Sequence, residues 1–438
     1  MPGIECRRDL NMRIILYLLA MLPTIVLGQQ QVVKGIRFEQ HRSWENIKAE
    51  ARTTGKLIFV DCYATWCMPC RKMDLNIFTI DSVGEYLNDK YVCVRVQMDT
   101  SKNDDDFVKS WYAIAHEIQS KHKVLAFPSY LFFSPDGEIL HRDMGYKKAH
   151  DFLCLARDAV DPQKEYFVLL RRYRQGYTDY QTMPYLAQLS RKIDENSLAD
   201  SIASVYIDHY LLKLGEGALY TKENIEFLVS FDGLIETNKK SFYCFFDHGD
   251  RVDSIMKING LSEYIVDAVV TREMITPWMT DPGKHVAPNW NMIYNSVGRK
   301  WGEKCADRTV LNAKVNWYNQ AKIWSEYTKY LVEKVDKYGV GKIMADAMLN
   351  DNAYYVFMRS NNKKELNRGL SWIDESLKMG KSDDANKMDT KSNLLYKLGE
   401  TQQAIDLEEK AFQLAPTNKD IRDNLAKMKK GEPTWPLD

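Results

Sequence analysis

The sequence lacks an excess of charge of either sign, because 60 lysines and arginines are balanced by 60 aspartates and glutamates. A partner that binds mainly through electrostatics, such as nucleic acid, is therefore not expected. Cysteine is also scarce, with eight residues in a chain of 438. That number is too small for a disulfide-stapled scaffold. The fold must therefore rest on hydrophobic cores, and the length allows two or three of them.

The N-terminal apolar run, residues 14–27, is short. A membrane-spanning helix needs roughly 20 apolar residues. Three arginines precede the run: Arg7, Arg8 and Arg13. We therefore predict a signal peptide over residues 1–28, cleaved before Gln29, and favour it over an uncleaved membrane anchor. Translation could begin at Met1 or at Met12, and the mature protein is expected in an oxidising compartment outside the cytoplasm.

Strand and helix patterns alternate over residues 32–161 in the order βαβαββα. The strand patterns cover residues 35–40, 56–64, 91–98, 129–134 and 138–142, the last two joined by a PDG turn. The helix patterns cover residues 43–51, 67–88, 104–121 and 147–160. This order predicts an α/β N-terminal domain with a central mixed sheet flanked by helices.

Strand patterns nearly vanish after residue 161. Amphipathic helices dominate instead, so residues 162–340 are predicted to be an all-α helical region. Residues 341–430 carry a more specific pattern in KLGETQQAIDLEEKAFQLAP, where Ala404, Ala411 and Pro416 have the intervals of a tetratricopeptide unit. This stretch resembles a tetratricopeptide repeat with a capping helix. Lys391 and Glu408 depart from the pattern, because the family has apolar residues there.

The motif WCMPC places Cys67 and Cys70 at the start of a predicted helix, directly after a buried strand. Two intervening residues put both sulfurs on one turn, so the second can resolve a mixed disulfide that the first has formed. Unpaired amides and the positive dipole end of the helix favour the thiolate of Cys67. We predict Cys67 as an exposed nucleophile and Cys70 as the recessed resolving thiol. Asp61 lies on the buried strand, where a carboxyl group is costly without a partner or a role.

These residues resemble the thioredoxin superfamily, because Asp61 lies six positions before Cys67 and the sequence Phe-Pro-Ser opens a later strand at Phe127. The segments CRKM, NIF and YVCVRV are similar to the exported branch that reduces or transfers disulfides in the bacterial envelope, which implies a periplasmic location. The resemblance implies that Asp61 lies beneath Cys70 and relays its proton, with a pKa raised by burial. It also implies that Pro128 is a cis-proline facing the sulfurs. Substrate contacts are expected at Trp66, Phe127 and Pro128.

Other cofactor signatures are missing from the sequence. No second Cys-x-x-Cys or His-x-His follows at a structural zinc spacing, so no metal site is predicted. Arg71 occupies the position after Cys70 where a c-type haem signature requires histidine. The helical half has neither a nucleophile elbow nor a phosphate loop. We therefore expect no cofactor beyond the dithiol itself.

The remaining mature cysteines have weaker patterns. Cys62 and Cys93 lie on strands whose offset is too large for a bridge, so both are predicted to be buried free thiols. Cys154 is predicted to lie in the core. Whether Cys244 and Cys305 pair with each other is left open by the sequence.

The sequence is compatible with three functions. The favoured one is an exported thiol-disulfide oxidoreductase that reduces or exchanges disulfides in client proteins. Its substrates would be protein thiols and disulfides, its electron donor an unidentified envelope protein, and its helical region a binding surface for clients or partners. The alternatives are a non-enzymatic interaction scaffold and a disulfide isomerase or holdase. A pure scaffold is disfavoured because the chain retains both sulfurs together with Asp61 and Pro128.

Overall fold

The computed structural model describes residues 35–39, 43–341, 344–380 and 383–436. The predicted signal peptide over residues 1–28 lies outside them. Contacts divide the chain into two compact units, Met1–Ile202 and Ala203–Asp438. Within the described residues all strands belong to the first unit.

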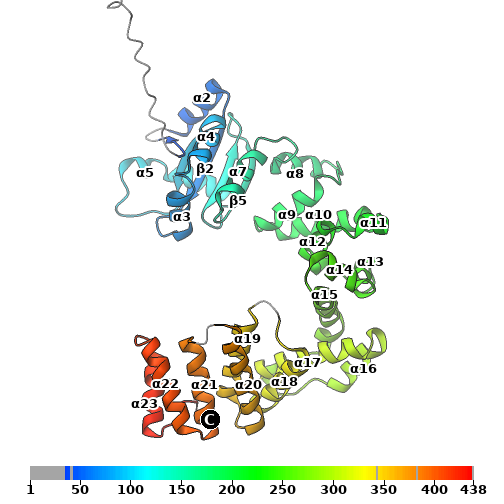
Figure 1. Ribbon diagram of the computed structural model, residues 1–438. Helices are drawn as coiled ribbons and strands as arrows, with labels where there is room; N and C mark the ends of the chain where they lie inside the picture. Colours follow the sequence, from blue (N-terminus) through cyan, green and yellow to red (C-terminus); the bar gives the residue numbers. More distant parts are fainter. Residues whose placement is uncertain (1–34, 40–42, 342–343, 381–382, 437–438) are drawn as a thin grey trace, which may run out of the picture. The chain divides into compact units, whose positions relative to one another are not determined.

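A mixed five-stranded sheet forms the centre of the first unit (Figure 1). Its strands are β1 (Phe38–Glu39), β2 (Leu57–Tyr63), β3 (Tyr91–Gln97), β4 (Ser129–Phe133) and β5 (Ile139–Met144). The order across the sheet is β1-β3-β2-β4-β5. The middle strand, β2, pairs parallel with β3 and antiparallel with β4. The predicted mixed sheet is confirmed, and its middle strand leads into the cysteine motif.

Helices cover both faces of this sheet. They are α2 (Trp44–Thr54), α3 (Met68–Asn76), α4 (Asp81–Lys90), α5 (Asp106–Ser110), α6 (Tyr112–Lys121) and α7 (Ala149–Asp158). Strand side chains alternate between the faces, so Val60 and Cys62 pack with α2 and α6, whereas Phe59 and Tyr130 pack with α3, α4 and α7. The result is a three-layer α/β/α arrangement with β2 buried on both sides.

Two predicted helices are each divided in the structure. Residues 67–88 form α3 and α4, because the chain before β1 docks against the break and the amide of Ile36 donates to the Phe78 carbonyl at 2.7 Å. Gly84 allows this close approach, since a Cβ there would lie 2.1 Å from the Gly35 carbonyl oxygen. Residues 104–121 divide into α5 and α6 at Trp111, which is buried against the sheet.

Two further helices, α8 (Tyr166–Arg174) and α9 (Met183–Lys192), pack on the edge strand β5. The Tyr166 amide donates to His141 Nδ1 at 3.1 Å, and Lys192 forms an ion pair with Asp143 at 2.6 Å. Both β5 side chains are buried. The compact unit therefore extends beyond residue 161, where the sequence pattern placed the end of the α/β domain.

The rest of the described chain is helical. The bounds run α10 (Asn196–His209), α11 (Glu216–Leu219), α12 (Lys222–Ser230), α13 (Lys240–Phe246), α14 (Gly249–Met256), α15 (Leu261–Val270), α16 (Trp290–Trp301), α17 (Glu303–Gln320), α18 (Trp324–Tyr338), α19 (Ala345–Arg359), α20 (Lys363–Met379), α21 (Ala385–Leu398), α22 (Thr401–Leu414) and α23 (Lys419–Lys430). The helices α17 and α18 are separated at Lys322, whose φ of 55° is incompatible with a continuous helix.

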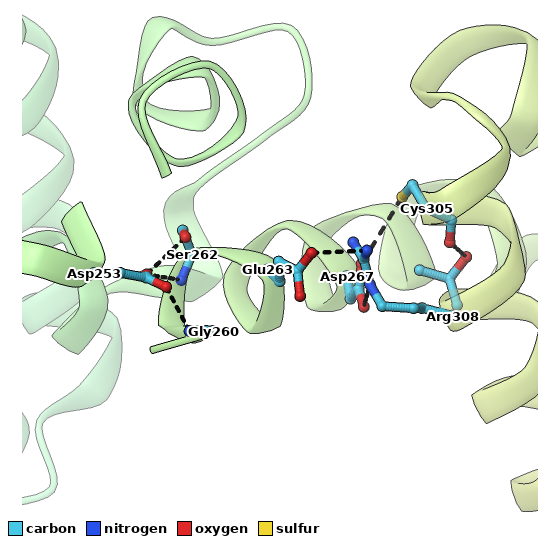
Figure 2. Close-up of polar contacts among 8 residues, drawn as sticks. Asp253, Gly260, Ser262, Glu263, Asp267, Cys305 and Arg308 are labelled. Atoms are coloured by element: carbon cyan, nitrogen blue, oxygen red, sulfur yellow. Dashed lines mark hydrogen bonds and ion pairs between the residues drawn. The ribbon is translucent and has the colours of Figure 1, made fainter. Parts of the chain in front are cut away.

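Hydrogen bonds and ion pairs connect α14 to α15 and α15 to α17 (Figure 2). The Asp253 carboxylate accepts hydrogen bonds from the amides of Gly260 and Ser262 and so caps α15. Arg308 of α17 forms ion pairs with Glu263 and Asp267 of α15, both at 2.9 Å. These groups serve the packing of the helices against one another.

The helices α19 to α23 lie side by side in sequence order (Figure 1). Gly399 ends α21 with a φ of 97°, a left-handed conformation that glycine adopts without steric cost. Ala404 and Ala411 of α22 are completely buried, as small residues at a close helix contact should be. Glu408 is also completely buried, whereas Lys391 reaches Asp374 at 2.7 Å.

Candidate functional site

Cys67 and Cys70 are joined by a disulfide at the start of α3. Cys67 is the N-cap residue, and its sulfur accepts a hydrogen bond from the Cys70 amide at 3.1 Å. The preceding loop is anchored by Thr65, whose amide donates to Asp99 at 3.0 Å. Pro69 lies in the first turn, where no intrahelical partner is needed for its nitrogen. This geometry places the Cys67 sulfur at the free amides of a helix start, which is an environment that favours a thiolate over a thiol.

The two cysteines are almost equally buried, with exposed fractions of 2% for Cys67 and 3% for Cys70. The prediction of an exposed Cys67 is therefore wrong for this disulfide form. The physical reason is a small cluster in which Tyr63, Ala64 and Phe127 pack around both sulfurs. Attack on a client in the reduced form requires part of this cover to give way, and the N-cap position is what distinguishes Cys67 from Cys70.

Trp66, Phe127 and Pro128 meet beside the disulfide. The Phe127–Pro128 peptide bond is cis, as the resemblance implied. The rings of Trp66 and Phe127 lie 5.8 Å apart in an edge-to-face arrangement. Trp66 is 69% exposed, so it belongs to the surface around the pair and not to the core. Trp66 and Phe127 therefore form a partly exposed aromatic surface next to the sulfurs of Cys67 and Cys70.

Asp61 is buried in the middle of β2, with 1% of its surface exposed. Burial raises its pKa to about 7, while the neighbouring Arg95 works in the opposite direction. Arg95 Nε donates to Asp61 Oδ2 at 3.1 Å. The other oxygen, Oδ1, has no hydrogen-bond partner among the described residues. A carboxyl group with a pKa near neutrality can take up and release a proton under physiological conditions.

Arg95 and Asp74 are site residues that the sequence did not single out. Arg95 is the register partner of Asp61 on β3, and it also reaches Asp74 of α3 at 3.0 Å. Asp74 lies about one helical turn after Cys70, so Arg95 connects the buried acid to the helix that carries the cysteines. The available signal was a single charged residue in the otherwise apolar strand YVCVRVQ.

The other mature cysteines are free thiols. Cys62 and Cys93 are buried as predicted, and they lie on opposite faces of the sheet. Cys154 was predicted to lie in the core, but it is half-exposed and contacts His150 at 3.5 Å. It occupies the flank of α7, because Phe152, Leu155 and Ala156 take the face toward the sheet. Cys244 and Cys305 are both buried and unpaired.

Other parts of the described chain carry no comparable chemistry. A cavity of about 640 Å³ in the helical unit is lined by Phe246, Trp301 and Arg308, among others. It contains none of the predicted site residues, and Arg308 is already satisfied by two carboxylates. Within the part of the chain that the structure covers, no helix is long and apolar enough to cross a membrane.

Comparisons with known proteins agree with this site. A family model for a thioredoxin-like domain matches residues 44–159. Similar curated proteins are the thiol:disulfide interchange proteins DsbD of Actinobacillus pleuropneumoniae, 29% identical over 126 residues, and of Yersinia enterocolitica, 30% identical over 128 residues. Each match covers 28% of this chain and 20% of the relative. The chain therefore matches about a fifth of the length of these relatives.

Two solved structures are similar to the same part of the chain. One is a solution structure of a candidate disulphide isomerase from Bacteroides thetaiotaomicron, with 28% identity and a TM-score of 0.25, covering 30% of this chain and 96% of that one. The other, a DsbH oxidoreductase, has 18% identity and a TM-score of 0.26, covering 33% and 97%. The family match and the sheet topology together identify residues 44–159 as a thioredoxin-like domain, followed by a mostly helical region.

Proposed function

We propose that this protein is an exported thiol-disulfide oxidoreductase whose working group is the pair Cys67 and Cys70. The observation that carries the proposal is their disulfide at the N-terminus of α3, on the sheet face that also buries Asp61. Relatives named as thiol:disulfide interchange proteins match 28% of the chain. A dithiol at this position can alternate between reduced and oxidised forms without any further cofactor.

In the first step the Cys67 thiolate attacks one sulfur of a client disulfide. The client S–S bond breaks, a mixed disulfide forms between Cys67 and one client cysteine, and the other client sulfur leaves and takes up a proton. The free amides at the start of α3 stabilise the attacking thiolate, including the Cys70 amide that faces its sulfur.

In the second step Cys70 attacks the sulfur of Cys67. The mixed disulfide breaks, the Cys67–Cys70 disulfide forms, and the second client thiol is released. The client gains two electrons and the pair loses two. Cys70 must give up its proton for this attack, and Asp61 is a buried acid on the strand that leads into the motif, with one oxygen unpartnered among the described residues and a pKa of about 7. We assign it the role of proton acceptor.

The cycle closes when a dithiol protein partner in the same compartment reduces the Cys67–Cys70 disulfide. A periplasmic location, reached through a cleaved signal peptide over residues 1–28, fits this requirement. The domain limits that we propose are 32–161 for the redox domain, 162–340 for the helical region and 341–430 for tetratricopeptide-like repeats. The helical regions would bind clients or partner proteins through their extended surface.

The experiment is turnover of insulin disulfides by the full-length protein with dithiothreitol as reductant. The Cys67→Ser variant is expected to lose activity by on the order of 10³-fold or more, because the nucleophile is gone. The matched control is Cys154→Ser, which removes a half-exposed thiol outside the site and should retain full activity. Equal turnover by the wild type and Cys67→Ser would eliminate the enzyme and leave a binding protein.

A further inference from the structure

A second cavity lies beside the cis-proline segment. It has a volume of about 240 Å³ and is lined by Leu125, Ala126, Ser129 and Arg142, together with Arg191 and Ile193 from the end of α9. Ala126 and Ser129 are the immediate chain neighbours of the cis pair Phe127–Pro128. The cavity therefore combines the segment expected to hold the client with a helix that lies outside residues 44–159.

Arg142 of β5 is the central polar group of this cavity. Its exposed fraction is only 8%, and its guanidinium donates to the carbonyls of His122 at 2.5 Å and Ile193 at 2.8 Å. A guanidinium has five N–H donors and remains charged at any physiological pH. Two neutral carbonyls orient this cation, but they do not neutralise it. No carboxylate lies within ion-pair distance of Arg142 among the residues that the structure describes.

The charged residues around Arg142 form ion pairs with other residues. Lys123 pairs with Glu195 at 3.0 Å, and Arg191 pairs with Asp200. The Asp143 carboxylate accepts from Lys147 at 2.9 Å and from Lys192 at 2.6 Å.

The two remaining titratable groups at this cavity do not neutralise Arg142. Asp194 accepts a hydrogen bond from Asn196 at 2.7 Å and makes no ion pair with Arg142. Burial lowers the pKa of His122 to about 4, so its ring is neutral near pH 7. Glu195 acts on Arg142 at longer range, but no carboxylate touches the guanidinium among the described residues.

We propose that this cavity binds an acidic side chain, aspartate or glutamate, close to the reacting cysteine of the client. The inference rests on the proposed function, because it places the client along the cis-proline segment. A carboxylate can accept from the remaining N–H donors of Arg142 and give the guanidinium a direct negative partner. Since α9 completes the cavity, this selectivity belongs to the chain as a whole and not to the thioredoxin-like fold alone.

The spacing along the client sets how far its acidic side chain can lie from the client cysteine. An extended client advances about 3.3 Å per residue. A residue two or three positions from the client cysteine therefore lies about 7 to 10 Å from the reacting sulfur. The client would have to pass the Phe127–Pro128 segment, because Phe127 packs against the two sulfurs and its neighbours Ala126 and Ser129 line the cavity. Ser129 Oγ donates to the Ala126 carbonyl at 2.6 Å and fixes the turn between them.

The test uses peptides that carry one cysteine as a mixed disulfide with neutral 2-thiopyridine. Glutamate is placed at successive positions on either side of the cysteine, and each peptide is compared with its glutamine counterpart. The reduced full-length protein is mixed with each peptide, and release of thiopyridone gives the second-order rate constant. At one position or more, glutamate should react about tenfold faster than glutamine, as expected for a charge-assisted hydrogen bond.

Three variants locate the effect. In Arg142→Met the ratio of glutamate to glutamine rates should fall to about one, whereas Arg142→Lys should keep part of the preference because it retains the charge. Lys72→Gln removes an exposed charge near the cysteines and should keep the wild-type ratio. The ratio cancels any general loss of reactivity in a variant. Equal rates at every position in the wild type, or an unchanged ratio in Arg142→Met, would overturn the proposal.

A second measurement does not depend on the variants or on catalysis. Amide resonances of Ala126, Ser129 and Ile193 in the wild-type protein should shift when a cysteine-free glutamate peptide is added, and should not shift with the glutamine peptide. Lack of these shifts overturns the acidic pocket even if disulfide exchange is normal. Failure of the protein to react with every peptide, while the shifts are present, contradicts the proposed function instead.

Discussion

Both units of this protein bury a carboxylic acid, and their surroundings differ. Asp61 lies in the middle of a sheet, touches Arg95 and keeps one oxygen free near the helix that carries the cysteines. Glu408 lies between helices, where Ser392 donates to it and no base neutralises it. Burial raises both pKa values, to about 7 for Asp61 and to about 9 for Glu408, where the charge of Asp389 adds to the effect.

The difference shows that a buried acid is not by itself a functional signal. A pKa near 7 allows Asp61 to exchange a proton, and a dithiol nearby gives that exchange a purpose. Glu408 remains a neutral acid at physiological pH, so it serves as a hydrogen-bonding group in the helix contact. Substitution of Asp61 by its amide should therefore reduce activity, whereas substitution of Glu408 by its amide should leave activity unchanged and alter the pH dependence of stability.

The largest effect is expected for Asp61→Asn. The amide cannot accept the proton of Cys70, so resolution of the mixed disulfide should slow about 10²-fold. The wild-type rate should rise with pH through the pKa of Asp61, about 7, and this rise should disappear in the variant. Stopped-flow release of the second client thiol measures the step. A variant with the wild-type pH profile would contradict the relay role, and Glu408→Gln is the control that should leave the rate unchanged.

The next effect is expected for Glu408→Gln, whose free energy of unfolding should depend less on pH than that of the wild type. A carboxyl group whose folded pKa is raised contributes stability that is complete below its unfolded pKa, near 4.5, and is lost as pH rises toward the folded value of about 9. The wild type should therefore weaken between about pH 5.5 and about pH 8.5 relative to the variant, by about 4 kcal/mol, since each pH unit in this range contributes about 1.4 kcal/mol.

Urea unfolding of both proteins at the two pH values measures this difference. The hydrogen bond from Ser392 should be present in both proteins, because a glutamine oxygen can still accept it. It therefore adds little to the difference between their free energies of unfolding. A constant difference between the two proteins across the pH range would mean that Glu408 is ionised when folded, against our interpretation of the helix contact.

A smaller effect is expected from the charges that flank Asp61. Arg95 lowers the pKa of Asp61, and Asp74 raises it. Arg95→Met should therefore move the pH midpoint of the resolution step upward by about one unit, and Asp74→Asn should move it downward by less. The two variants are matched, because they remove opposite charges around the same carboxyl group. Shifts in the same direction would show that the variants disturb packing and not the charge on Asp61.

Local patterns in the sequence predicted the sheet, and motif spacing predicted the cysteine pair, whereas the cis-proline was implied only by the resemblance to the thioredoxin superfamily. The division of residues 67–88 into α3 and α4 depends on the docking of Gly35 and Ile36, which no local pattern contains. The burial of Cys67 likewise depends on Phe127, which lies far along the chain in the loop before β4.

The ion pair between Asp61 and Arg95 depends on strand register, which follows only after β2 and β3 are paired. The attachment of α8 and α9 to β5 was also hidden, since their amphipathic patterns do not say which surface they cover. Arg142 and its cavity could not be inferred before that surface was known.

The central claim is that Cys67 attacks and Cys70 resolves. Its most direct test is a full-length Cys70→Ser variant, reduced and then exposed to insulin, with the products digested and identified by mass spectrometry. We predict a stable mixed disulfide between Cys67 and an insulin cysteine, because the resolving thiol is absent. An adduct on Cys154 or another cysteine in place of Cys67, or no adduct under conditions where the wild type turns over, would contradict the account.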